Sequence, residues 1–264
     1  MLGRRGFLLG AAAASLGPAM NRVAAQAPAL SPDRRAIGVI ELRQYTLFGG
    51  RRDALVALFE SAFIEPQEAV GAAILGIFHD LDDPDRLVWL RGFADMAARR
   101  RALDTFYSGP VWREHRQAAN ATMVDSDNVL LLRPSRPAAF ASAGREREGM
   151  YALRLYDLGH SSGEEFAAWF AASRRPQLEA LGADIVATFV SESAPNDFPA
   201  LPVRSDRVFA WLGRWSDAEA EAAFEARMTS ISGWRDRLPA TLLPALARKP
   251  ERIRLQPTSR SALR

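Results

Sequence analysis

The chain contains one supersecondary unit twice. The segment ELRQYTL at residues 41–47 recurs 111 positions later as ALRLYDL at residues 152–158. Further matches follow in the same order: Pro66-Gln67 with Pro176-Gln177, Asp85-Arg86 with Asp206-Arg207, Trp112-Arg113-Glu114 with Trp234-Arg235-Asp236, and LLLRP at 130–134 with IRLQP at 253–257. Because so many landmarks recur in one order, the sequence predicts two repeats. We place them at residues 38–134 and 150–257, with a linker at 135–149 and a tail at 258–264.

The first 27 residues have the form of a twin-arginine export signal. Arg4 and Arg5 precede an apolar run from Phe7 to Met20. That run is too short to span a bilayer, which takes about 20 apolar residues. We therefore expect cleavage near Ala25, a periplasmic mature protein and no stable membrane span after cleavage. A disordered basic tail or an uncleaved anchor is the alternative.

Removal of the signal leaves the mature chain without net charge. Arg4, Arg5 and Arg22 leave with it, so 31 basic residues remain against 31 acidic ones. The remaining arginines alternate with acids, which argues against a nucleic-acid partner. The run 99–101, three arginines within a helical pattern, is most simply a solvated face. With no cysteine, the chain has no disulfide, thiolate nucleophile or thiolate metal site.

Each half shows the pattern strand, helix, strand, strand, helix, strand. In the first half, the expected elements are strands at 39–47, 73–79, 87–93 and 129–133, and helices at 53–70 and from Asp95 to about Ala119. In the second half, Ser162 with Glu165 and Ser216 with Glu219 have the spacing of a capping box and predict two helix starts. The three prolines in residues 193–205 exclude regular pairing and indicate a lid or an ordered surface excursion.

This order predicts an α+β fold of two tandem ferredoxin-like βαββαβ repeats. In such a repeat, helices cover one face of a four-stranded sheet, and the other face needs a partner. Here the partner is in the same chain. We therefore expect the two sheets to face each other as an intramolecular dimeric α/β barrel of eight strands, whose interior is filled by side chains or holds one small ligand.

The same residues resemble the NIPSNAP family of the dimeric α/β barrel superfamily. The likeness rests on E-L-R-x-Y-x-L at 41–47, Pro66-Gln67 after an amphipathic helix, Trp112 after a proline, and the closing L-L-R-P at 131–134. It spans residues 38–257, more closely in the first half, since the second lacks the opening glutamate. The resemblance implies the barrel fold. It supplies no agreed catalytic residues, so these stay unknown.

One face of the first strand in each repeat carries an arginine and a tyrosine. Because side chains alternate along a strand, Arg43 and Tyr45 share a face with Glu41, and Arg154 shares one with Tyr156. If the opposite leucine face meets the helices, both Arg-Tyr pairs point into the barrel interior. A guanidinium fork and a phenol suit a carboxylate, phosphate or carbonyl. These five residues are therefore candidates to bind a small anionic or carbonyl-bearing aromatic ligand.

The other interpretation of these residues is structural, and it is the favoured one. A buried arginine is costly unless it is paired, and Glu41 lies two residues from Arg43 on the same face. The set would then be an internal ion pair that fixes the strand register. The aromatic residues of the third strands are expected in the core rather than on a stacking surface: Trp89, Phe93, Trp211 and Trp215. Trp112 and Trp234 are expected to anchor helices.

Other chemistry is sparse in the sequence. His79, His115 and His160 lie in different elements and are expected at the surface or in caps, so neither a metal site nor a haem site is predicted. The acidic turn at 80–85 could hold a hard cation, but a solvated turn is favoured because aspartate is an ordinary turn residue. No nucleophile elbow, phosphate loop or dinucleotide fingerprint is present, and no cofactor is predicted.

Two functions are consistent with these patterns. In the first, the mature protein is an exported module that binds a small molecule or a partner without turnover, with a homodimer as one assembly. In the second, it is a cofactor-independent enzyme of the oxygenase or isomerase type, in which the Arg-Tyr pairs polarise a carbonyl and His79 or His115 moves a proton. The first is favoured because the sequence shows no assembled proton-transfer site.

Overall fold

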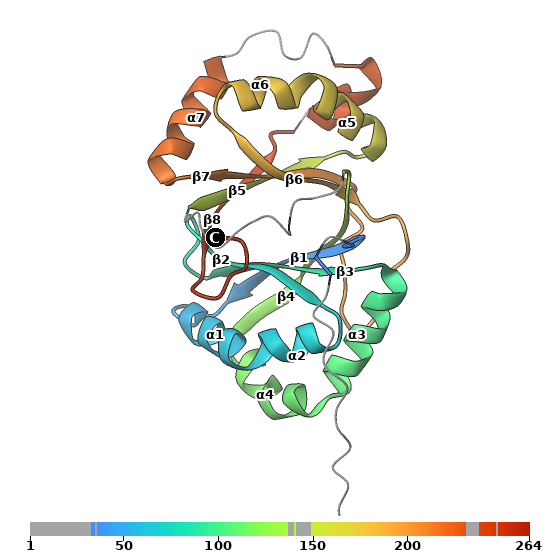
Figure 1. Cartoon of the computed structure of the whole chain (residues 1–264), viewed down its shortest axis with the longest axis vertical. Coiled ribbons are helices and arrows are strands. Elements are labelled where there is room, and N and C mark those ends of the chain that lie inside the picture. Colours follow the sequence, from blue (N-terminus) through green and yellow to red (C-terminus); the bar gives the residue numbers. More distant parts are fainter. Residues whose placement is uncertain (1–32, 35, 137–139, 141–148, 231–237, 247) are drawn as a thin grey trace, which may run out of the picture.

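The computed structural model describes residues 33–34, 36–136, 140, 149–230, 238–246 and 248–264 (Figure 1). The predicted export signal, most of the predicted linker and Trp234 lie outside these residues. In the part that is described, each helix falls short of the length or apolar character needed to cross a membrane.

The predicted order of elements is present in both repeats. The first repeat comprises β1 (Val39–Leu47), α1 (Arg52–Leu58), a π-helical segment (Phe59–Phe63), α2 (Ile64–Ala69), β2 (Ala73–Asp80), β3 (Arg86–Phe93), α3 (Met96–Ser108), α4 (Pro110–Asn120) and β4 (Met123–Pro134). The second comprises β5 (Met150–Asp157), α5 (Gly163–Trp169), a π-helical segment (Phe170–Arg174), α6 (Arg175–Ala180), β6 (Asp184–Ser191), β7 (Val208–Trp215), α7 (Ala218–Ser230), a 3-10 helix (Ala240–Leu246) and β8 (Glu251–Pro257).

The eight strands close into one barrel, which confirms the predicted α+β fold. Their order around the barrel is β1-β3-β2-β8-β5-β7-β6-β4. The repeats meet at two antiparallel seams, where Phe78 of β2 is paired with Pro257 of β8 and Leu132 of β4 with Ser191 of β6. In Figure 1, α1 to α4 lie on one side of the barrel and α5 to α7 on the other. The halves are therefore one structure rather than two separate domains.

The barrel interior is an apolar core built by both repeats. The buried cluster includes Ile40 and Leu42 of β1 and Leu153 and Leu155 of β5. The interior is thus filled by side chains, which is the first of the two predicted states. The opposite strand faces pack against the helices, and all four third-strand aromatics are buried there, as predicted. Trp112 packs against the helix-side cluster of the first repeat.

Two helix boundaries differ from the sequence prediction. The helix capped by Asp95 ends at Ser108, and α4 begins afresh at Pro110, because proline cannot donate the hydrogen bond that a continuous helix needs. In the second repeat, the cap of α7 is Asp217 rather than Ser216: its Oδ1 accepts a hydrogen bond from the Ala220 amide (2.8 Å). Ser162 does cap α5, as predicted.

The proline-rich segment 193–205, called the strap below, is an ordered excursion rather than a lid over the barrel. It leaves the second repeat and packs on α3 of the first. Phe198 is buried in a cluster with Phe93 and Leu103, and its ring stacks on Tyr107 with centroids 5.9 Å apart. The strap therefore joins the repeats outside the barrel.

The tail at 258–264 follows β8 and extends the seam between β8 and β2. The Thr258 amide donates to the Ile77 carbonyl (2.9 Å), and the Leu263 amide donates to the Leu75 carbonyl (3.0 Å). The Leu263 side chain is 2 % exposed and belongs to the interior cluster. The Tyr151 hydroxyl of β5 donates to the carbonyl of Arg264 (2.8 Å). The tail is thus part of the barrel core.

Candidate functional site

The structure places the five predicted site residues outside the barrel interior, so the predicted orientation is wrong. Tyr45 belongs to the buried cluster between the sheet and α1–α4, and Tyr156 to the cluster between the other sheet and α5–α7. The leucine faces meet in the interior instead. The physical reason is that helices can supply charged partners for an arginine, whereas the closed interior between two sheets takes apolar groups. The two Arg-Tyr pairs therefore lie on opposite sides of the barrel.

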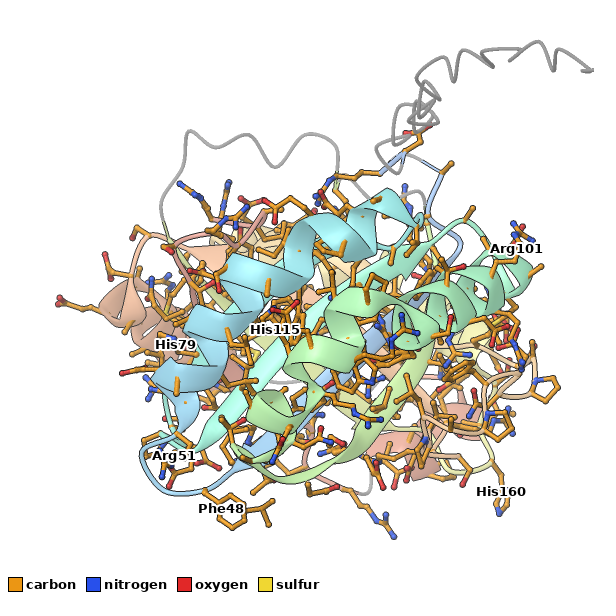
Figure 2. All side chains as sticks on the ribbon, turned by 90° about the horizontal axis from the view of Figure 1, so that it is seen from below. Phe48, Arg51, His79, Arg101, His115 and His160 are labelled. Carbon is orange, nitrogen blue, oxygen red and sulfur yellow. The ribbon has the colours of Figure 1, made fainter. Side chains whose placement is uncertain are left out.

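In the first repeat, Glu41 is the centre of a buried ion-pair network. Its carboxylate accepts hydrogen bonds from Arg43 Nη1 (2.9 Å), Arg91 Nε (2.7 Å) and Arg99 Nε (2.7 Å). Glu41, Arg91 and Arg99 are each 0 % exposed. Arg99 also donates to Asp197 of the strap (2.6 Å). The expectation of a solvated face at 99–101 is thus wrong for Arg99, while Arg101 projects from the surface (Figure 2).

The recurring Pro-Gln pair supports this network. Gln67 accepts a hydrogen bond from Arg91 Nη1 (2.8 Å) and donates from Nε2 to the carbonyl of Phe63 (3.0 Å), at the end of the π-helical segment. In the second repeat, Gln177 accepts a hydrogen bond from Arg174 Nη1 (3.1 Å). The glutamine therefore orients a guanidinium in each repeat.

The electrostatics of the first repeat make its network self-contained. Burial by itself raises the pKa of Glu41, but the three guanidiniums, led by Arg91, outweigh it and hold that pKa well below the usual carboxylate range. The Tyr45 hydroxyl accepts a hydrogen bond from Arg43 Nε (2.9 Å), and burial raises the pKa of Tyr45. The cavity beside Tyr45 has a volume of only 40 Å³. Among the described residues, the geometry of Glu41, Arg43 and Tyr45 matches the structural interpretation.

The second repeat has a much larger pocket at the corresponding place. Its volume is 540 Å³, which is within the usual range for small-molecule sites. The described residues that line it include four cations and one carboxylate: Arg154, Arg174, Arg248, Lys249 and Glu225. The other described lining residues are Tyr156, Met228, Thr229, Leu246 and Pro250. The pocket therefore combines an excess of positive charge with an apolar wall.

Two of the pocket's guanidiniums are buried. Arg154 and Arg174 are each 5 % exposed, and burial lowers the pKa of both from the ordinary arginine value. Arg154 lies over the Trp211 ring, 5.6 Å from its centroid, and pairs with Glu225. Its Nε has no hydrogen-bond partner among the described residues. Arg248 at the mouth is exposed and pairs with Asp157 (2.5 Å). Because these buried cations line an open pocket, the pocket favours the binding of an anion.

Smaller side chains account for the larger volume. When the two helix caps, Asp95 and Asp217, are aligned, Phe106 corresponds to Met228 and Tyr107 to Thr229. Phe106 and Tyr107 line the small cavity of the first repeat, and their counterparts line the large pocket. Aligning Pro66-Gln67 with Pro176-Gln177 pairs Ile64 with Arg174. The second repeat has therefore exchanged aromatic bulk for space and positive charge.

Another hollow, of 420 Å³, lies beside the tail. Two of its three arginines pair with neighbouring carboxylates, Arg34 with Glu68 (2.7 Å) and Arg260 with Glu65, and Arg264 donates to the carbonyls of Ser259 and Ser261. None of these three arginines is buried, whereas Arg154 and Arg174 are, so the second-repeat pocket is the candidate site.

The histidines and the acidic turn do not contribute to this pocket. His79 and His115 lie on the first repeat, and His160 is exposed on the second, away from both (Figure 2). The carboxylate of Asp80 accepts hydrogen bonds from the amides of Asp82 (2.8 Å) and Asp83 (3.2 Å), as in an ordinary turn. The described residues contain no group of three or more metal-ligating side chains suited to an ion.

Several residues important to both sites were missed in the sequence. Arg91 lies in a mostly apolar strand, and Arg174 is next to a second arginine, Arg175, so nothing local singles out either one as a site residue. Arg99 had a detectable signal, because Leu103 and Phe106 follow it at helical spacing and are buried. Glu225 had a signal only by comparison of the repeats, since its counterpart is Leu103.

Comparison with known proteins supports the fold and relates the first repeat to a known family. Residues 40–138 match the NIPSNAP family model. A protein from Lactobacillus acidophilus, described provisionally as a monooxygenase, is similar in structure over 84% of this chain and 94% of that chain, with 12% identity and a TM-score of 0.52. A Fusobacterium nucleatum protein with the same description covers 84% and 92%, with 9% identity and a TM-score of 0.51. No curated protein matches the sequence.

Proposed function

We propose that this chain, whose first repeat has the NIPSNAP sequence pattern, binds a small anionic organic compound in the second-repeat pocket. The observation that supports the proposal is the pair of buried guanidiniums, Arg154 and Arg174, on the wall of a 540 Å³ pocket. Guanidinium forks bind carboxylate or phosphate by two parallel hydrogen bonds. Met228, Leu246 and Pro250 suit the apolar part of such a compound.

A binding role is better supported than the enzymatic alternative. That alternative needs the Arg-Tyr pairs to converge on one substrate, and they lie on opposite sides of the barrel. Neither His79 nor His115 lines the pocket. The monooxygenase descriptions belong to the two similar structures, whose low identity limits the comparison to the fold.

Calorimetric titration with benzoate tests the proposal, with benzamide as the neutral probe of the same shape. We expect benzoate to bind and benzamide not to bind. Arg174→Gln and Arg154→Gln should each weaken benzoate binding about tenfold or more, because each removes a charged hydrogen bond. Arg101→Gln, an exposed arginine on the first repeat, is the control and should leave binding unchanged. Equal binding of benzoate and benzamide, or benzoate binding that ignores both buried arginines, would overturn the proposal.

Native mass spectrometry of the purified mature protein is a second test that needs no chosen probe. We expect a co-purifying anion that is lost from the Arg174→Gln protein.

The mass of the purified protein also tests signal cleavage, because we also propose that residues 1–27 direct export to the periplasm. Cell fractionation should then find the mature form in the periplasm, and Arg4→Lys with Arg5→Lys should retain the precursor in the cytoplasm.

A further inference from the structure

We infer that Glu225 is an internal competitor for the pocket: its carboxylate occupies Arg154 until an incoming anion displaces it. The inference rests on the proposed function and concerns the same pocket. Glu225 would then set the affinity of the pocket, and its ligands would be compounds that carry a carboxylate or a similar anionic group.

The contrast between the repeats shows why Arg154 needs a partner from a helix. In the first repeat, Arg43 pairs with Glu41 of its own strand, two residues away (2.9 Å). In the second repeat, that strand position is Ala152. Arg154 therefore has no carboxylate two residues before it on β5 and pairs instead with Glu225 of α7.

The two carboxylates differ in how firmly they are held. Glu41 is 0 % exposed and is bound by three guanidiniums, so its departure would leave buried guanidiniums without their counter-charge. The Glu225 side chain is 19% exposed and lines the pocket. A rotation of this side chain toward the pocket mouth would return its charge to water, which lowers the cost of separating the pair.

A neighbouring glutamate on the same helix shows that the helix can also hold a carboxylate firmly. Glu221, one turn earlier, is 0 % exposed and pairs with Arg252, whose Nε donates to its Oε1 (2.9 Å). Glu221 does not line the pocket among the described residues, whereas Glu225 does. The position that corresponds to Glu225 in the first repeat is Leu103, which packs in an apolar cluster. The carboxylate at this wall is thus a feature of the repeat that has the large pocket.

Displacement explains which ligands would succeed. An incoming carboxylate replaces one negative charge with another on the Arg154 fork and also gains Arg174. A neutral compound would leave Arg154 without a counter-charge if it displaced Glu225, so it should fail to bind. The carboxylate of Glu225 competes with every incoming anion and so lowers the affinity of the pocket for it. Removal of this carboxylate should therefore strengthen anion binding.

Calorimetry with benzoate on Glu225→Gln tests the inference. We expect binding about tenfold tighter than in the unmodified protein, since the competing charge is gone. Glu219→Gln removes the same charge from an exposed site on α7 and should change affinity by less than about twofold, because water and salt screen it. Glu225→Asp is the second variant: its side chain is one methylene shorter, which should weaken the contact with Arg154, so it should also tighten binding while keeping the charge of the helix.

The outcomes separate this inference from the proposed function. Equal or weaker binding in both Glu225 variants, with binding still dependent on Arg154 and Arg174, would overturn the competitor role and leave the proposed function standing. Equal tightening by Glu219→Gln would overturn it as well, because the effect would then be long-range charge alone. Failure of benzoate to bind any of these proteins, Glu225→Gln included, would overturn both.

Discussion

Arg99 of the first repeat and Asp197 of the second form an ion pair, with Nη1 and Oδ1 2.6 Å apart, although 98 positions separate them in the sequence. Arg99 also donates to Glu41, so the strap is attached directly to the buried network of the first repeat. The two repeats are therefore coupled through charge as well as through the barrel seams.

Phe198→Ala tests the strap as a clamp between the repeats. Phe198 is 9% exposed and its ring stacks on Tyr107, so its removal should cost about 3–5 kcal/mol of the free energy of unfolding. Limited proteolysis should then cut within 193–205 faster than in the unmodified protein. Ser205→Ala, at an exposed strap position, is the control. Equal cleavage of the two variants would show that the ring does not hold the strap.

Glu41→Gln tests the buried network itself. The amide keeps the shape of the side chain but leaves three guanidiniums without their shared charge. Breaking a buried ion pair from one side costs about 3–5 kcal/mol, and we expect a loss of that order in urea denaturation. Glu114→Gln, a side chain 74% exposed, should cost under about 0.5 kcal/mol. A similar small loss in Glu41→Gln would mean that the network is not a stabilising unit.

Glu41 should also make the stability depend on acid pH. Its folded pKa lies below the unfolded value, so the stability it contributes is complete above the unfolded pKa of about 4.5 and is lost as the pH falls toward the folded pKa. The urea concentration at the unfolding midpoint should therefore decrease as the pH is lowered from about 5 to about 3. In Glu41→Gln the same interval should show a shallower fall. Parallel profiles for the two proteins would assign the acid sensitivity to other carboxylates.

The duplication and the strand periodicity were sufficient to predict the barrel. Both depend on local patterns: alternation along a strand, helical spacing, and landmarks repeated in order. These patterns did not determine which face of each sheet points into the barrel. Alternation shows that Arg43 and Tyr45 share a face, but both faces of this sheet are buried, one by the opposite sheet and one by helices. The hydrophobic pattern alone could not show whether the arginine faces the barrel interior or the helices.

The pocket depends on contacts between elements far apart in the sequence. Arg154 comes from β5 and Glu225 from α7, and only the folded chain brings them together. One part was accessible in principle: aligning the two repeats by their helix caps shows Tyr107 replaced by Thr229, which predicts more space in the second repeat. The position of Arg174 beside that space follows from the helix packing and could not be obtained from spacing.

Leu263→Ala tests whether the tail belongs to the barrel core. The side chain is 2 % exposed within the interior cluster, so its truncation should leave a cavity and cost about 2–5 kcal/mol of the free energy of unfolding. Leu243→Ala is the matched control, because Leu243 is 52% exposed and its loss should cost under about 0.5 kcal/mol. Urea denaturation of both variants gives the comparison. Equal stability would show that the seam between β2 and β8 closes without the tail, whereas the expected difference makes residues 258–264 a structural part of the barrel.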